Sequence, residues 1–280
     1  MLYHIMNYSH MKISNIISRK NRILLRELVV TEFKLRYQDS VLGFMWSLLK
    51  PLLMFAILYF VFGQLLRIGS DIEHYAVYLL LGIVLWNFFV EATSQGLSAI
   101  VARGDLIRKI NFPKYIIVVS GTISALINLG INLIVIGIFM AINKVDLLPT
   151  APLVILPIIL LYVLSLAIAF YLSAANVKYR DVGHIWDILI QAAFYATPIL
   201  YPISMVIERS AIAGHLLMLS PVAQAIQDAR YFLITHQTVT SSQLFDRWYI
   251  TIIPYAITGI IIVAASLYFK KSSKYFAENV

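Results

Sequence analysis

The 280-residue chain is 60% hydrophobic and only 13% charged, and its mean hydropathy is +0.82. Because soluble domains usually carry about a quarter charged residues, this composition excludes a soluble globular protein and predicts a polytopic membrane protein. The net charge of +8 does not indicate nucleic-acid binding, since Lys and Arg gather in a few segments beside the apolar stretches. The chain has no cysteine, which excludes disulfides and thiolate metal sites.

The first 40 residues are predicted to form a cytoplasmic arm with one amphipathic helix, from Ile16 to Tyr37. Its apolar stripe contains Ile17, Leu24, Leu28 and Leu35, and its basic side contains Arg19, Arg22 and Arg26. Such a helix either lies in the membrane interface or packs on a cytoplasmic partner, and the sequence leaves both interpretations open.

Six apolar stretches follow, each with about the 20 residues needed to cross a hydrocarbon core about 30 Å thick. They are predicted at 41–66, 75–97, 116–142, 153–175, 185–203 and 249–269, within a transmembrane domain of residues 41–270 that a tail, 271–280, follows. The sequence thus predicts an all-α integral membrane protein with six transmembrane helices and an N-terminal interfacial helix. Pro198 and Pro202 interrupt the fifth stretch, and a moderately apolar segment with two short helix-like runs, 204–247, precedes the sixth.

The basic residues predict the orientation. With six crossings, the N-terminal arm, the loops after the second and fourth stretches and the tail lie on one side of the membrane. They hold seven, four, two and three of the 22 Lys and Arg residues, against five in the opposite loops. Since cytoplasmic segments carry the excess of Lys and Arg, we expect both termini in the cytoplasm and the segment 204–247 on the outer side.

The chain contains neither the phosphate-binding motif G-x-x-x-x-G-K-[ST] nor the metal motif H-E-x-x-H. No carboxylate pair recurs at metal-ligand spacing. We therefore expect a transport protein rather than an enzyme, with no cofactor or metal in this chain. Its energy must come from an ion gradient or from another subunit.

Lys50, Glu91 and Asp187 lie within or near the predicted crossings. A charged side chain in hydrocarbon costs about 3 kcal/mol on insertion scales, so each is a candidate functional residue. All three are also expected near the cytoplasmic interface, where a long side chain such as Lys50 can extend to the lipid headgroups. No carboxylate lies at a clear midplane, which weakens a proton-coupled mechanism.

Aromatic residues recur inside two of the predicted crossings. The first contains Phe55, Tyr59 and Phe62, and the fifth contains Phe194, Tyr195 and Tyr201. Sugar rings stack their apolar C–H faces on such side chains, so an aromatic-lined path would suit a glycan. Packing or lipid-facing aromatic residues give the same spacing.

The loop from Val101 to Tyr115 contains GDLIRKINFP, which predicts a short amphipathic helix that stops before Pro113. Its apolar residues Leu106, Ile107 and Ile110 can insert into a groove while Arg108 and Lys109 face an acidic partner. A loop that served topology alone would not need this apolar side.

Four sequence blocks resemble the transmembrane permease subunits of ABC-2-type polysaccharide exporters, which move lipid-linked O-antigens and other cell-surface glycans. In chain order the blocks are LRYQDSVLGFMWSLLKPLL (Leu35–Leu53), LLLGIVLWNFFVEA (Leu79–Ala92), LIRKINFPK (Leu106–Lys114) and NVKYRDVGHIWDILIQAAFYATPILYP (Asn176–Pro202). The resemblance extends from about Glu27 to Phe276. Because four blocks occur in the same order around six predicted crossings, the resemblance is more specific than a match to any single short motif.

This resemblance implies a homodimer in the inner membrane, with two copies of a separate ATPase subunit that binds ATP and magnesium. The coupling interface would lie in the arm and in the loop 101–114, with Arg22, Arg26, Arg103, Asp105, Leu106, Ile107, Arg108, Lys109 and Ile110. The path between protomers would be lined by the first and fifth helices, with Lys50, Phe55, Tyr59, Phe62, Trp186, Phe194, Tyr195 and Tyr201. The segment 204–247 would form short outer gate helices, and the substrate would be a polyprenyl-pyrophosphate-linked glycan whose pyrophosphate Lys50 could attract.

Three positions differ from the pattern of these permeases. Thr31-Glu32 stands where Arg-Asp is common, and Lys50-Pro51 and Ser220-Pro221 stand where Asn-Pro is common. These differences leave the fold unchanged but bear on the substrate. A permease for teichoic acid or a small hydrophobic drug is the first alternative, and an ion-coupled secondary transporter or a membrane enzyme is the second.

Overall fold

The computed structural model describes residues 18–37, 42–70, 72–245 and 247–279, and among these residues it contains helices and no strand. The prediction of an all-α membrane protein is therefore confirmed. The long helices are α2 (Arg19–Tyr37), α3 (Trp46–Leu58), α4 (Tyr75–Ala102), α6 (Tyr115–Ile142), α7 (Ile155–Lys178), α8 (Val182–Ala196) and α14 (Ile253–Ser272). The short helices are η2 (Gly43–Met45), η3 (Tyr59–Leu65), α5 (Gly104–Lys109), η4 (Ala151–Val154), α9 (Ile203–Arg209), α10 (Ala211–Met218), α11 (Pro221–Leu233), α12 (Ser241–Leu244), α13 (Trp248–Thr251), η5 (Ser273–Tyr275) and α15 (Phe276–Asn279).

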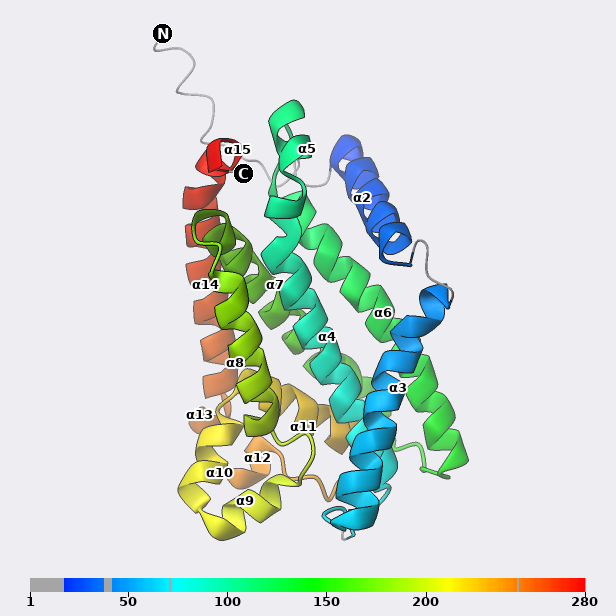
Figure 1. The fold of residues 1–280 in the computed structure, drawn as a ribbon. Helices are drawn as coiled ribbons and strands as arrows, with labels where there is room; N and C mark the ends of the chain where they lie inside the picture. The colour runs from blue at the N-terminus through cyan, green and yellow to red at the C-terminus, as the bar shows by residue number, and fades with distance from the viewer. Residues whose placement is uncertain (1–17, 38–41, 71, 246, 280) are drawn as a thin grey trace.

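The long helices stand side by side in one bundle (Figure 1). Helices α2, α5 and α15 lie at one end of the bundle, which we call the α5 end, and α9, α10 and α12 lie at the opposite end, the α9 end. Within the described residues, five helical stretches are long and apolar enough to cross a membrane: Gly43–Leu65, Tyr75–Ala102, Tyr115–Ile142, Ala151–Lys178 and Tyr249–Asn279.

The fifth predicted crossing differs from the sequence-based expectation of one helix over 185–203. Helix α8 has 15 residues and therefore rises only about 22 Å, less than the core of about 30 Å. It ends because Thr197 precedes Pro198 and is extended, with ψ 137°. From there a non-helical segment of turns and bends, 197–202, leads to α9.

The first predicted crossing, 41–66, also departs from one regular helix, although residues 38–41 lie outside the described part of the chain. A 3₁₀ turn at Gly43–Met45 precedes α3, and the π-helix η3 follows it. Pro51 lies inside α3 and lacks the N–H that would bond the carbonyl of Ser47. Asn132 of α6 donates to that carbonyl at 3.4 Å, so a neighbouring helix satisfies the group that the proline leaves free.

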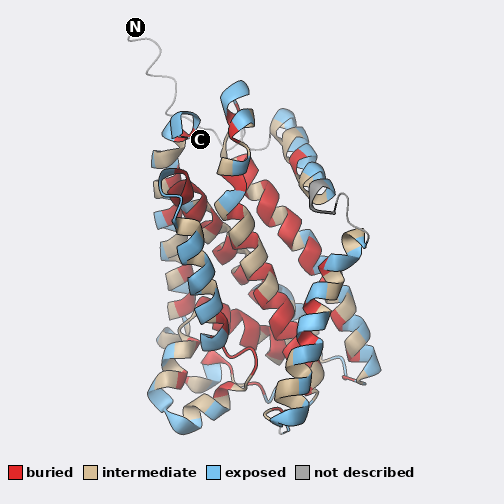
Figure 2. Cartoon of the chain, in the orientation of Figure 1, coloured by how far each residue is buried: buried red, intermediate tan, exposed pale blue. Residues whose placement is uncertain are grey.

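Helix α4 is the most buried of the crossing helices, with 78% of its apolar window inside the protein (Figure 2). It packs against α6 and α7 along its length and also contacts α3, α8 and α11. The close approach to α7 is possible because Gly96 has no side chain: a Cβ there would lie 2.3 Å from the Cβ of Ala169. Small residues allow this close helix packing where lipid supplies no hydrophobic driving force.

A separate apolar cluster lies at the α5 end. It contains Leu28, Ala99, Ile100, Ile107, Phe112, Ile116, Ile117, Val118, Ala169, Ala174, Val177, Phe269 and Phe276. The cluster joins α2, α4, α5, α6, α7, α14 and α15. We call it the end cluster below.

At the α9 end, the two helix-like runs predicted between 204 and 234 form three helices. Ser210 separates α9 from α10, and its hydroxyl accepts a hydrogen bond from the N–H of Ala213 at 3.3 Å, as a helix N-cap does. Helix α11 then packs inward against α4, α7 and α14.

Candidate coupling and transport sites

Helix α5 stands beyond the bundle at the α5 end (Figure 1). Asp105 lies in its first turn and Arg108 in its last, and the guanidinium and carboxylate are 2.6 Å apart. Each charge matches the sign that its helix end favours. Asp105, Arg108, Lys109 and Ile110 are exposed, so this helix presents charged groups and one apolar side chain at the surface.

The apolar residues predicted for α5 differ in burial. Ile107 is buried in the end cluster, where α15 also packs against α5, and Leu106 is partly buried beside it. Ile110 is 54% exposed. Thus Ile107 fixes α5 to the bundle, and Ile110 is the apolar residue left for a partner.

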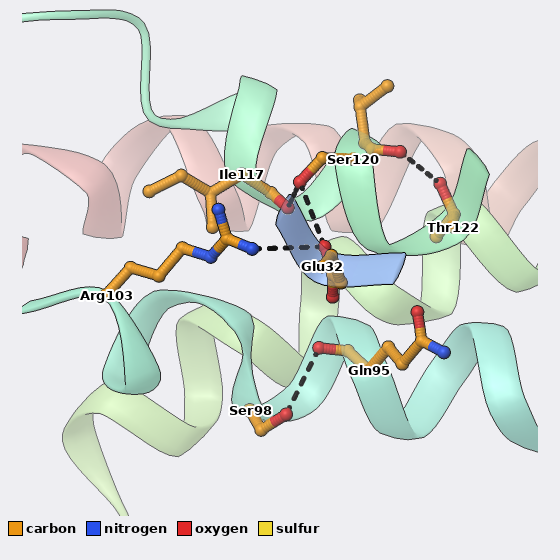
Figure 3. Close-up of polar contacts among 8 residues, drawn as sticks. Glu32, Gln95, Ser98, Arg103, Ile117, Ser120 and Thr122 are labelled. Carbon is orange, nitrogen blue, oxygen red and sulfur yellow. Dashed lines mark hydrogen bonds and ion pairs between the residues drawn. The ribbon is translucent and has the colours of Figure 1, made fainter. Parts of the chain in front are cut away.

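Arg103, at the junction of α4 and α5, turns inward to Glu32 of α2 (Figure 3). Its Nη2 is 3.2 Å from Oε2 of Glu32, and the hydroxyl of Ser120 in α6 donates to the same oxygen at 3.4 Å. The side chains of Arg103 and Glu32 are only 18% and 21% exposed. This contact joins α2, α6 and the start of α5, so Arg103 acts within the chain rather than on its outer surface.

Helix α2 packs along α6 through its apolar stripe, with Leu28 buried and Leu24 partly buried in the end cluster. Arg22 and Arg26, the two predicted coupling residues of the arm, are exposed, as is Arg19. Ile17 and the side chain of Leu35 lie outside the described part of the chain.

Most aromatic residues predicted for the path pack within the protein. Phe55 is buried and stacks on Tyr59 with ring centroids 5.5 Å apart, and Phe194 is buried against Trp86 with centroids 5.8 Å apart. Phe62, Trp186 and Tyr201 are partly buried against the same core. Tyr195, at 63% exposed, and Lys50 are the two predicted path residues that remain exposed.

Lys50 and Glu91 line one cavity of about 600 Å³ between α3, α4 and α6. Glu91 accepts hydrogen bonds from Nδ2 of Asn128 at 2.7 Å and from Nε2 of Gln95 at 3.0 Å. The other predicted intramembrane charge, Asp187, is exposed on α8 and does not line this cavity. The full lining is Trp46, Ser47, Lys50, Pro51, Val84, Asn87, Phe88, Val90, Glu91, Ser94, Gln95, Asn128, Leu129 and Asn132.

A fully buried arginine, Arg230 of α11, was missed by sequence reasoning, which counted it as an ordinary cation of an outer loop. Its Nη1 donates to the carbonyl of Pro198 at 2.7 Å, and its Nη2 donates to the carbonyl of Ile199 at 2.7 Å. Its Nε donates to the carbonyl of Tyr78 at 3.1 Å, and the guanidinium lies 3.6 Å from the centre of the Tyr78 ring. The hydroxyl of Tyr75 donates to the carbonyl of Leu200 at 2.8 Å.

These contacts explain how the non-helical segment 197–202 is tolerated inside the protein. Pro198, Ile199 and Leu200 are buried, and their carbonyls have no helical partner. An unpaired carbonyl is costly in an apolar environment, so Arg230 and Tyr75 supply the missing donors. The available sequence signal was the pair Gln227 and Arg230, three residues apart on one helix; Oε1 of Gln227 accepts from Nη1 of Arg230 at 2.8 Å.

Among the described residues, no group of three His, Asp or Glu side chains is placed to hold a metal ion. Residues 23–234 match the family described as ABC-2 type transporter. An O-antigen export system permease protein RfbA of Myxococcus xanthus is 30% identical over 262 residues, which cover 92% of this chain and 96% of that protein. A protein of the same name from Klebsiella pneumoniae is 27% identical over 251 residues, 88% of this chain and 91% of its own length.

The family predicted from the four sequence blocks is thereby confirmed. The match covers the cavity, Arg230 and helix α5, and it describes a transport subunit rather than an enzyme. The chain belongs to the ABC-2 type transporter family, as a multi-pass membrane permease subunit.

Proposed function

We propose that this permease is the membrane-spanning part of an ATP-driven exporter that carries a lipid-linked, O-antigen-like polysaccharide outward across the inner membrane. It would act as a homodimer with two ATPase subunits on the cytoplasmic side. The names of the two relatives support the substrate class, and their matches run along about nine tenths of this chain.

The observation that carries the coupling proposal is the construction of α5. Its surface is charged, while its inner side is fixed by Ile107 in the end cluster. A force applied to Arg108 and Lys109 would therefore move α4, α6 and α15 rather than bend a loose loop. The Arg103–Glu32 contact would pass the same force to α2.

The α5 end is proposed to face the cytoplasm. Helices α2, α5 and α15 lie at this end (Figure 1), and the described basic residues of α2, α5 and the tail are exposed, in agreement with the positive-inside rule. The gate helices α9 and α10 would then lie on the outer side.

Charge reversal on α5 tests the coupling site. In cells that supply a P-loop ATPase from the same transport system, Arg108→Glu combined with Lys109→Glu should abolish co-purification of that ATPase with the permease. Arg209→Glu, on exposed α9 at the opposite end, is the matched control and should leave co-purification unchanged. Equal co-purification with both variants would contradict the assignment of α5.

The substrate class needs a separate measurement. Reconstituted permease and ATPase should hydrolyse ATP faster in the presence of a polyprenyl-pyrophosphate-linked glycan than in the presence of the unglycosylated lipid. Stimulation by teichoic acid or by small hydrophobic drugs, without stimulation by the glycan, would replace the proposed substrate. Transport without any ATPase, driven by an ion gradient, would overturn the coupling mechanism as well.

A further inference from the structure

Several polar side chains line the cavity between the membrane helices α3, α4 and α6. Four of its lining residues are carboxamides: Asn87, Gln95, Asn128 and Asn132. Lys50, Glu91 and Ser94 add an ammonium, a carboxylate and a hydroxyl, and Trp46 supplies an indole that is 47% exposed. Polar groups at this position are costly in lipid and usually serve a function.

Part of this polarity holds the helices together. Asn128 bonds Glu91 across α6 and α4, and Asn132 bonds the Ser47 carbonyl that Pro51 leaves free. If these polar residues served helix packing alone, we would expect the helices to be in contact here without a cavity between them. The space instead amounts to about 600 Å³, within the range of about 300–1,000 Å³ that small-molecule sites occupy.

Other polar groups of the lining have no partner. Oε1 of Gln95 is buried and accepts no hydrogen bond. Within the described part of the chain, the side chains of Lys50, Asn87 and Ser94 also make no hydrogen bond or ion pair. The ammonium of Lys50, the carboxamide of Asn87 and the hydroxyl of Ser94 can therefore bond a ligand in the cavity, whereas Oε1 of Gln95 is too deeply buried for a ligand to reach.

The kinds of group in the lining select among ligands. The lining offers a bare phosphate or pyrophosphate a single cationic side chain, Lys50, and it also contains the carboxylate of Glu91. Carboxamides and hydroxyls both donate and accept, which matches a ligand covered with hydroxyl groups. The exposed indole of Trp46 offers a flat apolar surface beside them, suited to the C–H face of a ring.

We infer that the cavity between α3, α4 and α6 binds one sugar residue of the glycan, held by the carboxamides and Glu91 and stacked on Trp46. This inference rests on the proposed function, because it assumes that a glycan reaches the membrane domain. It changes the sequence-based hypothesis for Lys50: the ammonium contributes one hydrogen-bond donor to a sugar site and is not the centre of a pyrophosphate site.

The lack of native cysteine allows a direct test. In the full-length permease reconstituted in lipid nanodiscs, Ser94→Cys places a single thiol in the cavity wall. Ser98→Cys, about one turn further along α4 and exposed outside the lining, is the matched control. The rate of maleimide labelling is measured with glucose, N-acetylglucosamine or mannose, with inorganic pyrophosphate, and with phosphoethanolamine as a stand-in for a lipid headgroup.

A sugar should slow labelling of the Ser94→Cys variant by the factor 1 + [sugar]/Kd, about tenfold at nine times Kd, and should leave the Ser98→Cys variant unchanged. Adding Trp46→Ala should raise the sugar concentration for half protection by about tenfold, whereas Trp46→Phe should largely preserve it. Asn176→Ala removes a hydrogen bond between α7 and α4 that lies away from the cavity, and it should not alter protection.

Protection by pyrophosphate or phosphoethanolamine but by none of the three sugars would overturn the inference and identify an anion or headgroup site. Absence of protection by any probe would also overturn it. Both results are independent of ATPase binding, so they can be separated from failure of the proposed function. Sugar protection in the nanodisc assay, combined with failure of the permease to co-purify with any ATPase in the separate coupling experiment, would keep the binding site and reject the ATP-driven exporter.

Discussion

At the scale of single residues, Arg230 organises the α9 end of the molecule. It joins α11 to the carbonyls of Tyr78, Pro198 and Ile199, and it has no carboxylate partner in the described part of the chain. A buried charge is tolerated when hydrogen bonds satisfy it. Gly82 is part of the same arrangement, because a Cβ there would lie 2.3 Å from Nη2 of Arg230.

Arg230→Ala should therefore lower the melting temperature of the purified permease more than any exposed arginine does. The change leaves the buried carbonyls of Pro198 and Ile199 without their donors, and each unsatisfied group costs about 1–3 kcal/mol. Arg209→Ala, at an exposed position of α9, serves as the comparison. If the two variants unfold at the same temperature in detergent, the carbonyls of segment 197–202 do not depend on Arg230.

Asp228 also lies on α11, and we expect its ionisation to make the stability of the protein depend on pH. Burial raises the pKa of its carboxyl to about 7, although a hydrogen bond with Gln224 acts in the opposite direction. Because the folded protein holds this proton more tightly than the unfolded chain, the contribution to stability is full below the unfolded value of 3.8 and is lost as pH rises towards 7.

The melting temperature should accordingly fall between pH 5 and pH 8, and Asp228→Asn should remove that part of the fall. Scanning fluorimetry of both proteins at the two pH values measures the difference. An identical fall in the variant would show that other groups cause it.

At the scale of elements, the contact between α4 and α7 depends on small residues. Gly96 faces Ala169 so closely that a Cβ would approach both the Cβ, at 2.3 Å, and the backbone Cα, at 2.8 Å. Backbone cannot move aside as the end of a flexible side chain can. The position of α4 in the middle of the bundle therefore depends on Gly96, a residue whose contribution a hydropathy profile does not show.

Gly96→Ala should destabilise the permease although alanine favours helix formation by about 1 kcal/mol over glycine. Gly130→Ala, in α6 with no atom within 4 Å of the added Cβ, should be neutral or stabilising. The melting temperatures of the two variants test this contrast. Similar melting temperatures for both variants would mean that α4 and α7 accommodate the added methyl group without loss of stability.

At the scale of the whole molecule, the Glu32–Arg103 pair connects the N-terminal helix with the start of α5. The pair is sheltered, so its contribution should exceed that of the exposed Asp105–Arg108 pair, whose side chains are 81% and 52% exposed. The Glu32–Arg103 pair also joins two helices that are distant in the sequence, whereas Asp105 and Arg108 lie on the same helix.

A double-mutant cycle tests this connection. Glu32→Gln and Arg103→Gln should each lower stability, and the double variant should lose less than the sum, with a coupling free energy of about 0.5–3 kcal/mol. The cycle Asp105→Asn with Arg108→Gln is the control and should show about 0.2–1 kcal/mol. Additive losses at Glu32 and Arg103 would contradict a direct interaction.

Hydropathy and local motifs were enough to predict the membrane class, the family and the approximate position of most crossing helices. These properties depend on hydropathy over about 20 residues and on local motifs, which neighbouring helices do not alter. The sequence also predicted that α5 has an apolar and a charged side. It did not predict that Ile107 would be buried within the same chain while Ile110 remains exposed, because the same pattern suits packing and partner binding.

Only the packing of the helices shows the burial of the segment after α8, the role of Arg230 and the grouping of Lys50 with Glu91. Each depends on residues far apart in the chain: Arg230 meets Pro198 and Tyr78, and Glu91 meets Asn128. A proline in a predicted helix indicates a possible break, but only the donors supplied by Arg230 and Tyr75 make a buried non-helical segment stable. In the same way, separate polar residues on three helices form one cavity only when the helices pack together.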